Sequence, residues 1–294
     1  MDWNTRRVAA ILEQALLEDR ALHDATTELT LNPRLPASGT IWAKQNCVLA
    51  GWEAIPHILA AFRKLDQAST GRFEAVHHPE IFDSVRVHKG QAIAVIRGNA
   101  RMILACERIM LNLLQRMCGI ATETRRYVDA VKGTGAVILD TRKTVPGLRM
   151  LDKYAVCCGG GQNHRMDLAD GVLIKNNHIS LGGGLAQVLA RAVKLRKSGQ
   201  KIQVEVRSME ELQAAIDGGA DSLLLDNMTA SQAKRAVSFA RKLRANIPIE
   251  ASGGVTLETV RKYAQTGVNY ISVGALTHSV TAIDLSMRIT AEIY

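Results

Sequence analysis

Short apolar runs alternate with amphipathic stretches from residue 136 onward. The runs are Ala136–Asp140, Gly171–Lys175, Ile202–Arg207, Asp221–Asn227, Ile247–Gly254 and Tyr270–Leu276. They begin roughly 20 to 35 residues apart, which is the repeat length of a βα unit in a parallel sheet. Unbroken apolar runs are typical of parallel strands that are buried on both faces. This part of the chain therefore predicts either a β/α barrel or a doubly wound sheet.

The stretches between the runs carry signals for helix ends. Ser208 and Thr229 each stand three positions before a Glu or Gln, which is the spacing of a capping box. Gly218-Gly219 and Gly267 stand where helix C-caps are expected. We therefore expect helices between the strands, as a parallel sheet requires.

Polar and small residues at the ends of the runs favour the barrel. They are Asp140, Lys175, Glu205, Arg207, Asp226, Ser252 and Gly274. In β/α barrels the active site lies at the C-terminal ends of the strands, with a phosphate site after the last two. The segments Ser252-Gly253-Gly254 and Val273-Gly274-Ala275 occupy those two positions, where glycines let backbone N–H groups approach a phosphate.

The first 118 residues follow another pattern. Thr40–Leu49 and Ser84–Ile96 are expected as strands, and Thr5–Asp19 and Trp52–Leu65 as helices. This predicts a mixed α/β domain over 1–118, followed by a catalytic barrel domain over 119–277, with the join near Glu107–Thr122.

The join itself predicts a buried helix. Apolar residues cover most of the circumference of Glu107–Met117 and leave a narrow polar stripe at Arg108, Asn112 and Gln115. An arginine on such a helix needs an anionic partner. That partner is either a bound ligand or a local carboxylate with a structural role.

Charge and composition narrow the classes of function. The chain of 294 residues has a formal charge of +9 and a pI near 9.5, which favours anionic ligands. Aromatic residues make up only 4%, and no basic run alternates with aromatics as in nucleic-acid-binding proteins. We therefore expect no nucleic-acid partner, and a basic nucleic-acid-binding module is the least favoured interpretation.

Targeting signals are not evident in the sequence. No apolar run reaches the ~18 residues that a bilayer-spanning helix needs, and no secretory signal follows Met1. The five cysteines are odd in number and lack the spacing of a zinc site. We expect a soluble protein of the reducing cytoplasm, with no membrane partner.

The densest cluster of candidate chemistry lies after the runs that end at Asp140 and Lys175 and after the triple glycine Gly159–Gly161. Its members are Thr141, Arg142, Lys143, His164, Arg165, Lys175 and His178. Arginine binds carboxylates through two parallel hydrogen bonds, whereas lysine acts as a point charge suited to phosphate. The cluster predicts a pocket for more than one anionic group. Glu205 and Asp226 would then contact ribose hydroxyls or a Mg²⁺ ion, or would only neutralise the lysines.

These motifs, taken together, resemble one known family. ERIMLNLLQRMCGIAT, LDTRKTVPGLRMLDKYAVCCGGGQNHRMDLAD, IKNNH, VEV, LDN, SGG and ISVGALTHS closely resemble the quinolinate phosphoribosyltransferases, in the same order and spacing. The resemblance is strong over residues 100–290 and looser before them. The segment Glu18–Asp24 departs from the family pattern, and so does Arg207, where Glu or a neutral residue is common.

The resemblance implies a fold and a reaction. The fold is an open β/α barrel with fewer than eight strands, of the type II phosphoribosyltransferase kind, and the tail 278–294 returns to the N-terminal domain. The reaction transfers phosphoribosyl from phosphoribosyl pyrophosphate to quinolinate with decarboxylation, and yields nicotinate mononucleotide, pyrophosphate and CO₂ for NAD biosynthesis. Mg²⁺ is the implied cofactor, and a homodimer with a shared active site is the implied assembly.

The resemblance also implies roles for individual residues. Quinolinate would contact Arg142, Arg165, Lys175, His164 and Thr141, with Arg108 reaching in from the other subunit. Pyrophosphate would contact Lys143 and Lys175, whereas Glu205 and Asp226 would hold ribose and hydrated Mg²⁺. The 5-phosphate would rest on Ser252, Gly253, Gly254, Val273, Gly274 and Ala275. Lys143, Lys175, Glu205 and Asp226 are the implied catalytic residues.

Two other enzyme classes share parts of this pattern. A paralogous group associated with molybdenum transport has the same fold and many of these motifs, so a different phosphoribosyl acceptor is an alternative. A phosphosugar isomerase or synthase would share the phosphate site but would not need the cluster around Arg142 and Arg165.

Overall fold

The computed structural model describes residues 1–66 and 72–292 of the chain. Two compact units divide it: Met1–Glu123 with Val145–Gly160 and Ser279–Tyr294, and Thr124–Thr144 with Gly161–His278. The expected boundary at 118 thus lies close to the observed one. Residues 145–160, which we expected within the barrel domain, belong to the first unit instead.

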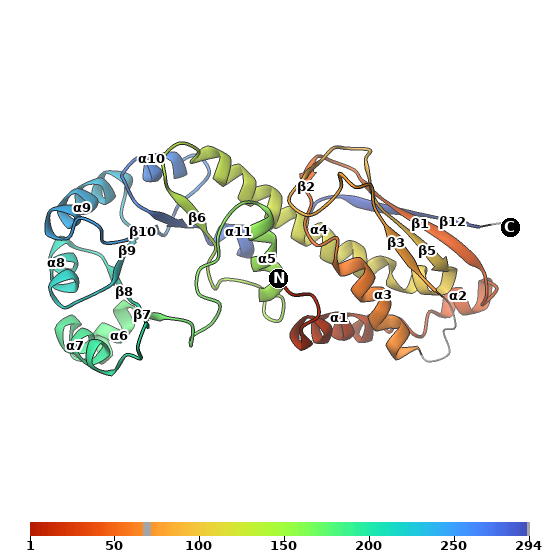
Figure 1. The fold of residues 1–294 in the computed structure, drawn as a ribbon, viewed down its shortest axis with the longest axis horizontal. Helices are drawn as coiled ribbons and strands as arrows, with labels where there is room; N and C mark the ends of the chain where they lie inside the picture. Colours follow the sequence, from red (N-terminus) through yellow and green to blue (C-terminus); the bar gives the residue numbers. More distant parts are fainter. Residues whose placement is uncertain (67–71, 293–294) are drawn as a thin grey trace. The chain divides into compact units, whose positions relative to one another are not determined.

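The second unit is built on a six-stranded sheet in the order β6-β11-β10-β9-β8-β7 (Figure 1). Its strands are β6 (Val137–Leu139), β7 (Val172–Ile174), β8 (Ile202–Val206), β9 (Ser222–Asp226), β10 (Ile249–Ser252) and β11 (Tyr270–Ser272). Every neighbouring pair is parallel. Strands β6 and β7 are the two edges, so the barrel is open. Each strand lies within one of the apolar runs, which confirms the predicted fold class.

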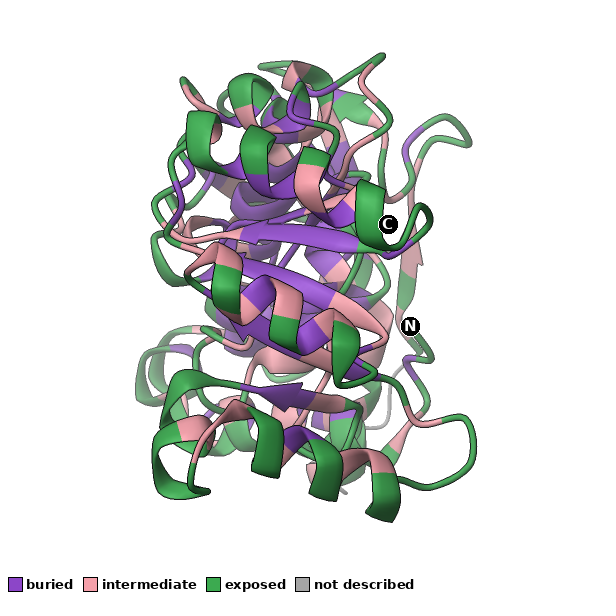
Figure 2. Ribbon diagram, turned by 90° about the vertical axis from the view of Figure 1, so that its left-hand side faces the viewer, coloured by how far each residue is buried: buried purple, intermediate pink, exposed green. Residues whose placement is uncertain are grey.

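Helices follow the strands and cover the outside of this sheet. They are α6 (Asn176–Leu181), α7 (Leu185–Leu195), α8 (Met209–Asp217), α9 (Ala230–Leu243), α10 (Val260–Ala264) and α11 (Ala275–His278). Figure 2 shows buried strands behind helices whose outer faces are exposed. The capping box at Thr229 and Gln232 is present. At Ser208 only half of it forms, because the Glu211 carboxylate accepts the Arg207 backbone N–H instead.

Alternation along each strand separates the core from the barrel interior. Val204, Leu223 and Ile249 are fully buried, as expected for residues that pack against the helices. Their neighbours Glu205 and Glu250 point the other way and line the interior. Because successive side chains in a strand face opposite sides, every second residue of the sheet is available to a site inside the barrel.

The first unit contains an antiparallel sheet in the order β12-β1-β5-β3. Its strands are β1 (Pro36–Ala43), β3 (Glu74–Val76), β5 (Ala92–Asn99) and β12 (Leu285–Ala291), beside a small pair of β2 (Cys47–Val48) and β4 (Arg86–Val87). Both expected strands are therefore broken in two. Strand β12, from the end of the chain, pairs with β1 along its length, from Ala37↔Ala291 to Ala43↔Leu285.

Helices complete the first unit. They are α1 (Arg6–Glu18), α2 (Ala25–Thr30), α3 (Ala54–Leu65), α4 (Ala100–Ala130) and α5 (Arg149–Cys158). The helix predicted over 107–117 is thus the middle of a much longer one, which ends within the second unit. No helix of the described residues combines the length and the apolarity needed to cross a membrane.

Helix α5 joins the first unit through polar contacts. The Arg116 guanidinium donates to both oxygens of the buried Asp152 carboxylate, each at 2.8 Å. The Tyr154 hydroxyl donates to Asp83 at 2.5 Å, and its ring meets Trp3 edge-on. A buried, bidentate guanidinium–carboxylate pair is costly to break. These contacts explain why residues 145–160 group with the first unit, although their sequence lies between two barrel strands.

Candidate active site

A cavity of about 470 Å³ opens at the C-terminal ends of the barrel strands. All the predicted site residues except Arg108 and His178 line it: Thr141, Arg142, Lys143, His164, Arg165, Lys175, Glu205, Asp226, Ser252, Gly253, Gly254, Val273, Gly274 and Ala275. These residues come from segments up to 134 positions apart, from Thr141 to Ala275. The parallel arrangement brings them together, because it places the C-terminal end of every strand on the same side.

Four cationic side chains line the cavity: Arg142, Lys143, Arg165 and Lys175. Burial lowers the pKa of the Arg165 guanidinium, and the nearby charge of Arg142 lowers it further, whereas Asp170 raises it. Like charges held side by side destabilise the empty site. A bound anion would remove that cost, so the place beside Arg142 and Arg165 is suited to carboxylates or phosphates.

The loop that carries two of these cations is held in place by hydrogen bonds. The Lys143 backbone N–H donates to Thr141 Oγ1 at 3.0 Å, and the Thr277 hydroxyl donates to the Lys143 carbonyl at 2.9 Å. The buried Asp140, directly before this loop, accepts the His164 backbone N–H at 2.9 Å. The loop after β6 is thereby tied to two other segments of the site.

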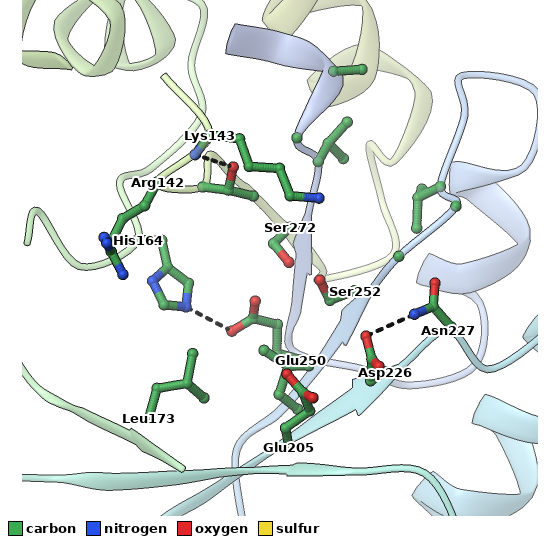
Figure 3. A pocket seen from close by; sticks show the side chains of 18 of the residues that line it. Arg142, Lys143, His164, Leu173, Glu205, Asp226, Asn227, Glu250, Ser252 and Ser272 are labelled. Atoms are coloured by element: carbon green, nitrogen blue, oxygen red, sulfur yellow. Dashed lines mark hydrogen bonds and ion pairs between the residues drawn. The ribbon is translucent and has the colours of Figure 1, made fainter. Parts of the chain in front are cut away.

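His164 points toward Glu250 across the floor of the cavity (Figure 3). Its Nδ1 accepts the backbone N–H of Arg165 at 2.8 Å, and its Nε2 lies 3.5 Å from Glu250 Oε2. Because Nδ1 accepts a hydrogen bond, the ring proton belongs on Nε2, from which it can be donated to Glu250. The contacts thus select one neutral tautomer of His164.

Glu250 is a buried carboxylate within an otherwise apolar strand. Burial raises its pKa, but hydrogen bonds from His164, Gln203 and Ser272 outweigh that effect and leave the pKa below its usual value. The Gln203 amide donates to Oε2 at 2.8 Å. Glu250 is therefore ionised at neutral pH and fixes the floor of the cavity.

Glu205 and Asp226 lie at the ends of the neighbouring strands β8 and β9 and also line the cavity. Glu205 Oε2 is 4.0 Å from Lys175 Nζ, and the Asn227 amide donates to Asp226 Oδ1 at 3.0 Å. Both carboxylates also contact Arg207. In the described chain no group of three or more His, Cys, Asp or Glu side chains could hold a metal. Two carboxylates fit Mg²⁺, which keeps several waters and binds substrate phosphates.

Glycine-rich segments after β10 and β11 form the remaining wall. Gly253 has φ +95° and Gly254 has φ +64°, in the left-handed region that favours glycine. A Cβ on Gly253 would collide with the Asn227 side chain, and one on Gly274 would lie 3.0 Å from His278. The backbone therefore comes close to the cavity here, as a phosphate site requires.

Some residues of the site were missed from the sequence. Asn227, Glu250, Thr256, Ser272 and His278 also line the cavity. Glu250 had a usable signal, since a carboxylate inside an apolar run must be paired or functional. Asn227, Ser272 and His278 lie within the quoted motifs LDN and ISVGALTHS, but their residue types alone did not single them out. Thr256 had no signal.

His178 was grouped with the cationic cluster, but it is not among the residues that line the cavity. Its Nδ1 accepts the Lys175 backbone N–H at 2.9 Å at the start of α6. This contact gives His178 a structural role at the helix N-terminus.

Arg108 lies on α4 in the first unit, and its side chain is exposed. Asn112, the next residue of the polar stripe, is exposed as well. Gln115 is half-buried, and its amide donates to the Leu285 carbonyl of β12 at 3.1 Å. The apolar residues of this helix segment are buried, as predicted. Within the polar stripe, Gln115 supports β12, whereas Arg108 is exposed.

An open parallel barrel whose mouth joins four cations, two carboxylates and paired glycine segments defines an enzyme for phosphorylated, anionic substrates. Residues 120–288 match the family model for the C-terminal domain of quinolinate phosphoribosyl transferase, and residues 24–118 match that for its N-terminal domain. The chain belongs to this family, which confirms the resemblance read from its motifs.

Relatives match along nearly the whole chain. The probable nicotinate-nucleotide pyrophosphorylase [carboxylating] of Bacillus subtilis is 40% identical, over 98% of this chain and 95% of its own. The nicotinate-nucleotide pyrophosphorylase [carboxylating] of Mycobacterium leprae is 41% identical, over 91% and 94%. The crystal structure of NadC from Streptococcus pyogenes superposes with a TM-score of 0.89 at 32% identity, and all of both chains is covered.

Proposed function

We propose that this protein transfers the phosphoribosyl group of phosphoribosyl pyrophosphate to quinolinate and releases pyrophosphate and CO₂, with nicotinate mononucleotide as the product. One observation carries the proposal: a single cavity is lined by four cations, two carboxylates and two glycine segments. Family membership supports the same reaction, since relatives are named as carboxylating nicotinate-nucleotide pyrophosphorylases.

The neighbouring guanidinium groups of Arg142 and Arg165 are assigned to quinolinate. Each can form a bidentate pair with one of its two adjacent carboxylates. Lys175 also lines the cavity and adds a point charge. The Nε2 of His164 is directed to Glu250, 3.5 Å away. His164 thereby fixes the floor against which the pyridine ring lies.

The glycine segments, the two carboxylates and the two lysines are assigned to phosphoribosyl pyrophosphate. Backbone N–H groups of Gly253, Gly254 and Gly274 are suited to the 5-phosphate, because glycine allows close approach. Glu205 and Asp226 would accept hydrogen bonds from the ribose hydroxyls. Lys143 and Lys175 would bind the pyrophosphate, whose negative charge grows as it leaves.

The chemistry follows from these positions. The pyridine nitrogen attacks C1 of the ribose while the bond from C1 to the pyrophosphate oxygen breaks, and the leaving group keeps that electron pair. Glu205 and Asp226 stabilise the positive charge that develops on the ribose. The bond between ring C2 and its carboxylate then breaks, CO₂ leaves, and its electron pair stays on C2 beside the cationic nitrogen. C2 finally takes a proton from water.

Magnesium is part of this proposal. Glu205 and Asp226 are the residues that would hold the ion, largely through water, and it would neutralise the pyrophosphate.

A direct assay tests the reaction. Purified protein with Mg²⁺ and phosphoribosyl pyrophosphate should release labelled CO₂ from quinolinate carrying the label in its 2-carboxylate. Nicotinate, which lacks that carboxylate, is the matched control acceptor and should react poorly. Failure to release CO₂, or equal use of nicotinate, would contradict the proposal.

We also propose that the active unit is a homodimer in which Arg108 completes the partner's cavity. The exposed position of Arg108 on an otherwise buried helix supports this assembly. Arg108→Ala and Lys175→Ala should each abolish quinolinate use. Co-expressed, they should recover about a quarter of wild-type activity, because half of a statistical mixture of two-fold dimers keeps one intact site. A mixture as inactive as its parents would exclude the shared site.

A further inference from the structure

The four carboxylate oxygens of Glu205 and Asp226 already have partners within the chain. Glu205 Oε2 lies 4.0 Å from Lys175 Nζ, and its Oε1 lies 3.5 Å from Arg207 Nη2. Asp226 Oδ1 accepts from the Asn227 amide at 3.0 Å, and its Oδ2 lies 3.0 Å from both Nε and Nη2 of Arg207. One guanidinium therefore bridges the two carboxylates that the proposed function assigns to ribose and hydrated metal.

The local fold directs Arg207 toward this place. It follows directly on β8, and the next residue, Ser208, is the N-cap of α8. The Arg207 backbone N–H donates to the Glu211 carboxylate at 2.7 Å, while the Ser208 hydroxyl accepts the Glu211 backbone N–H at 3.2 Å. The backbone on either side is thus fixed by a reciprocal pair of hydrogen bonds, so the side chain starts from a defined point.

The bridge is arranged so that it can open. The Arg207 side chain is 49% exposed, whereas those of Glu205 and Asp226 are 9% and 15% exposed. An ion pair with one partner in water contributes little free energy, because solvent screens it and can replace it. The carboxylates are fixed in the strands, and the guanidinium is the part that can move away.

We propose that Arg207 competes with a divalent cation for Glu205 and Asp226, and so sets the metal concentration at which this part of the site fills. A cation held by both carboxylates, directly or through its water ligands, needs the space that Nη2 occupies between them. The two positive charges would also repel each other at that distance. The role of the metal in turnover rests on the proposed function, but the competition is a property of these three side chains.

Charge balance leads to the same conclusion. With Arg207 and Lys175 in place, two cations offset two carboxylates. Without Arg207 the group carries a net negative charge, which attracts hard divalent cations more strongly.

Metal binding without substrates tests the proposal. Mn²⁺, a cation that carboxylates bind as they bind Mg²⁺, is titrated alone into the full-length protein, and free Mn²⁺ is read by electron paramagnetic resonance. Arg207→Gln removes the charge but keeps a polar side chain. It should lower the Kd for Mn²⁺ by about fivefold or more, which corresponds to about 1 kcal/mol. Arg207→Lys keeps the charge but loses the bridging fork, and should give an intermediate value.

Arg196→Gln is the matched control. Arg196 also pairs with a carboxylate at the sheet, Asp221 at 2.6 Å, but outside this cavity. Its loss should leave the Kd unchanged. An Arg207→Gln protein that melts like wild type yet binds Mn²⁺ no more tightly would overturn the proposal, and so would an absence of binding in every variant.

The two proposals fail separately. The titration contains no quinolinate and no phosphoribosyl pyrophosphate, so its outcome does not depend on the reaction. Tighter Mn²⁺ binding by Arg207→Gln in a protein that releases no CO₂ would support the competition and contradict the function. The reverse pattern would contradict the competition alone.

Discussion

The barrel has one cavity at the C-terminal ends of its strands and another at their N-terminal ends. Charged side chains have different partners at these two ends. The cavity at the N-terminal ends has a volume of about 590 Å³. There, Asp221 pairs with Arg196 and accepts the Ile202 backbone N–H at 2.8 Å. Arg244 donates to the Ala220 carbonyl at 2.8 Å. Charges at this end complete the hydrogen bonds of the backbone where strands start.

At the C-terminal ends, Arg142 lies close enough to Arg165, which borders both cavities, for its charge to lower the pKa of Arg165. Such an arrangement costs stability in the empty protein. At the N-terminal ends the charged side chains pair with carboxylates and backbone groups, so this end supports the fold. At the C-terminal ends like charges lie near each other, so this end is suited to binding an anion. This contrast can be tested by substitutions made in matched pairs, one at each end.

The largest expected effect is on substrate use. Arg165→Ala should lower kcat/KM for quinolinate on the order of 10²–10³-fold, since losing a buried charge partner costs roughly 2–5 kcal/mol. Its free energy of unfolding should hardly fall, because a like-charge contact is relieved. Arg196→Ala, at the other end, should change kcat/KM less than twofold. Steady-state CO₂ release and urea unfolding measure both quantities, and equal losses of activity would remove the contrast.

Glycines at the two ends should also differ. Gly253→Ala introduces both left-handed strain and a collision with Asn227, and should reduce kcat/KM for phosphoribosyl pyrophosphate about a hundredfold, or roughly 2–3 kcal/mol. Gly171 has φ +88° and lines the other cavity, but a Cβ there meets no atom within 4 Å. Gly171→Ala should therefore cost about 1 kcal/mol of stability and spare the kinetics. A kinetic defect in Gly171→Ala would weaken the comparison.

Glu250 lines both cavities, so it tests where the two ends meet. Its pKa is lowered from an ordinary value of 4.5, so the ionised form stabilises the fold above that pH. This contribution is lost as the pH falls through the lowered value in the folded protein. Glu250→Gln should lower the free energy of unfolding at pH 7 by roughly 1–3 kcal/mol. The difference from wild type should narrow below pH 4.5 in urea titrations, and a difference that widens there would contradict the assignment.

The smallest effect belongs to the supporting end. Asp221→Asn keeps the shape but removes the charge opposite Arg196, whose side chain is 33% exposed. Solvent screening limits the loss to about 0.5–1 kcal/mol. Urea unfolding should detect it, while the KM values for both substrates stay within twofold of wild type. A change in either KM would show that this end is coupled to catalysis.

The barrel was accessible from sequence because its signals are local. Each strand lies in one apolar run with its polar residue at the end, so the runs predicted both the fold and the lining of the cavity. Glu205, for example, directly follows the core residue Val204, and Asp226 directly follows the core residue Leu225. Parallel geometry then makes the positions of such ends predictable without knowing which strands are neighbours.

The remainder depended on contacts between distant segments. Strand β1 owes half of its pairing to β12, whose residues follow it by more than two hundred positions, and no local pattern announces that partnership. The assignment of α5 to the first unit rests on pairs such as Arg116 with Asp152. The bridge by Arg207 was visible only as a departure from the family pattern, because its two partners lie on different strands.

The pairing of β1 with β12 has a consequence for how the protein is made. Residues 285–291 leave the ribosome only after the whole barrel has been synthesised, so the sheet of the first unit waits for them. Until then β1 has an unpaired edge, which is a template for pairing with the wrong chain. The second unit can therefore fold before the first unit has been fully synthesised. The nascent chain is most prone to misassembly just before β12 emerges.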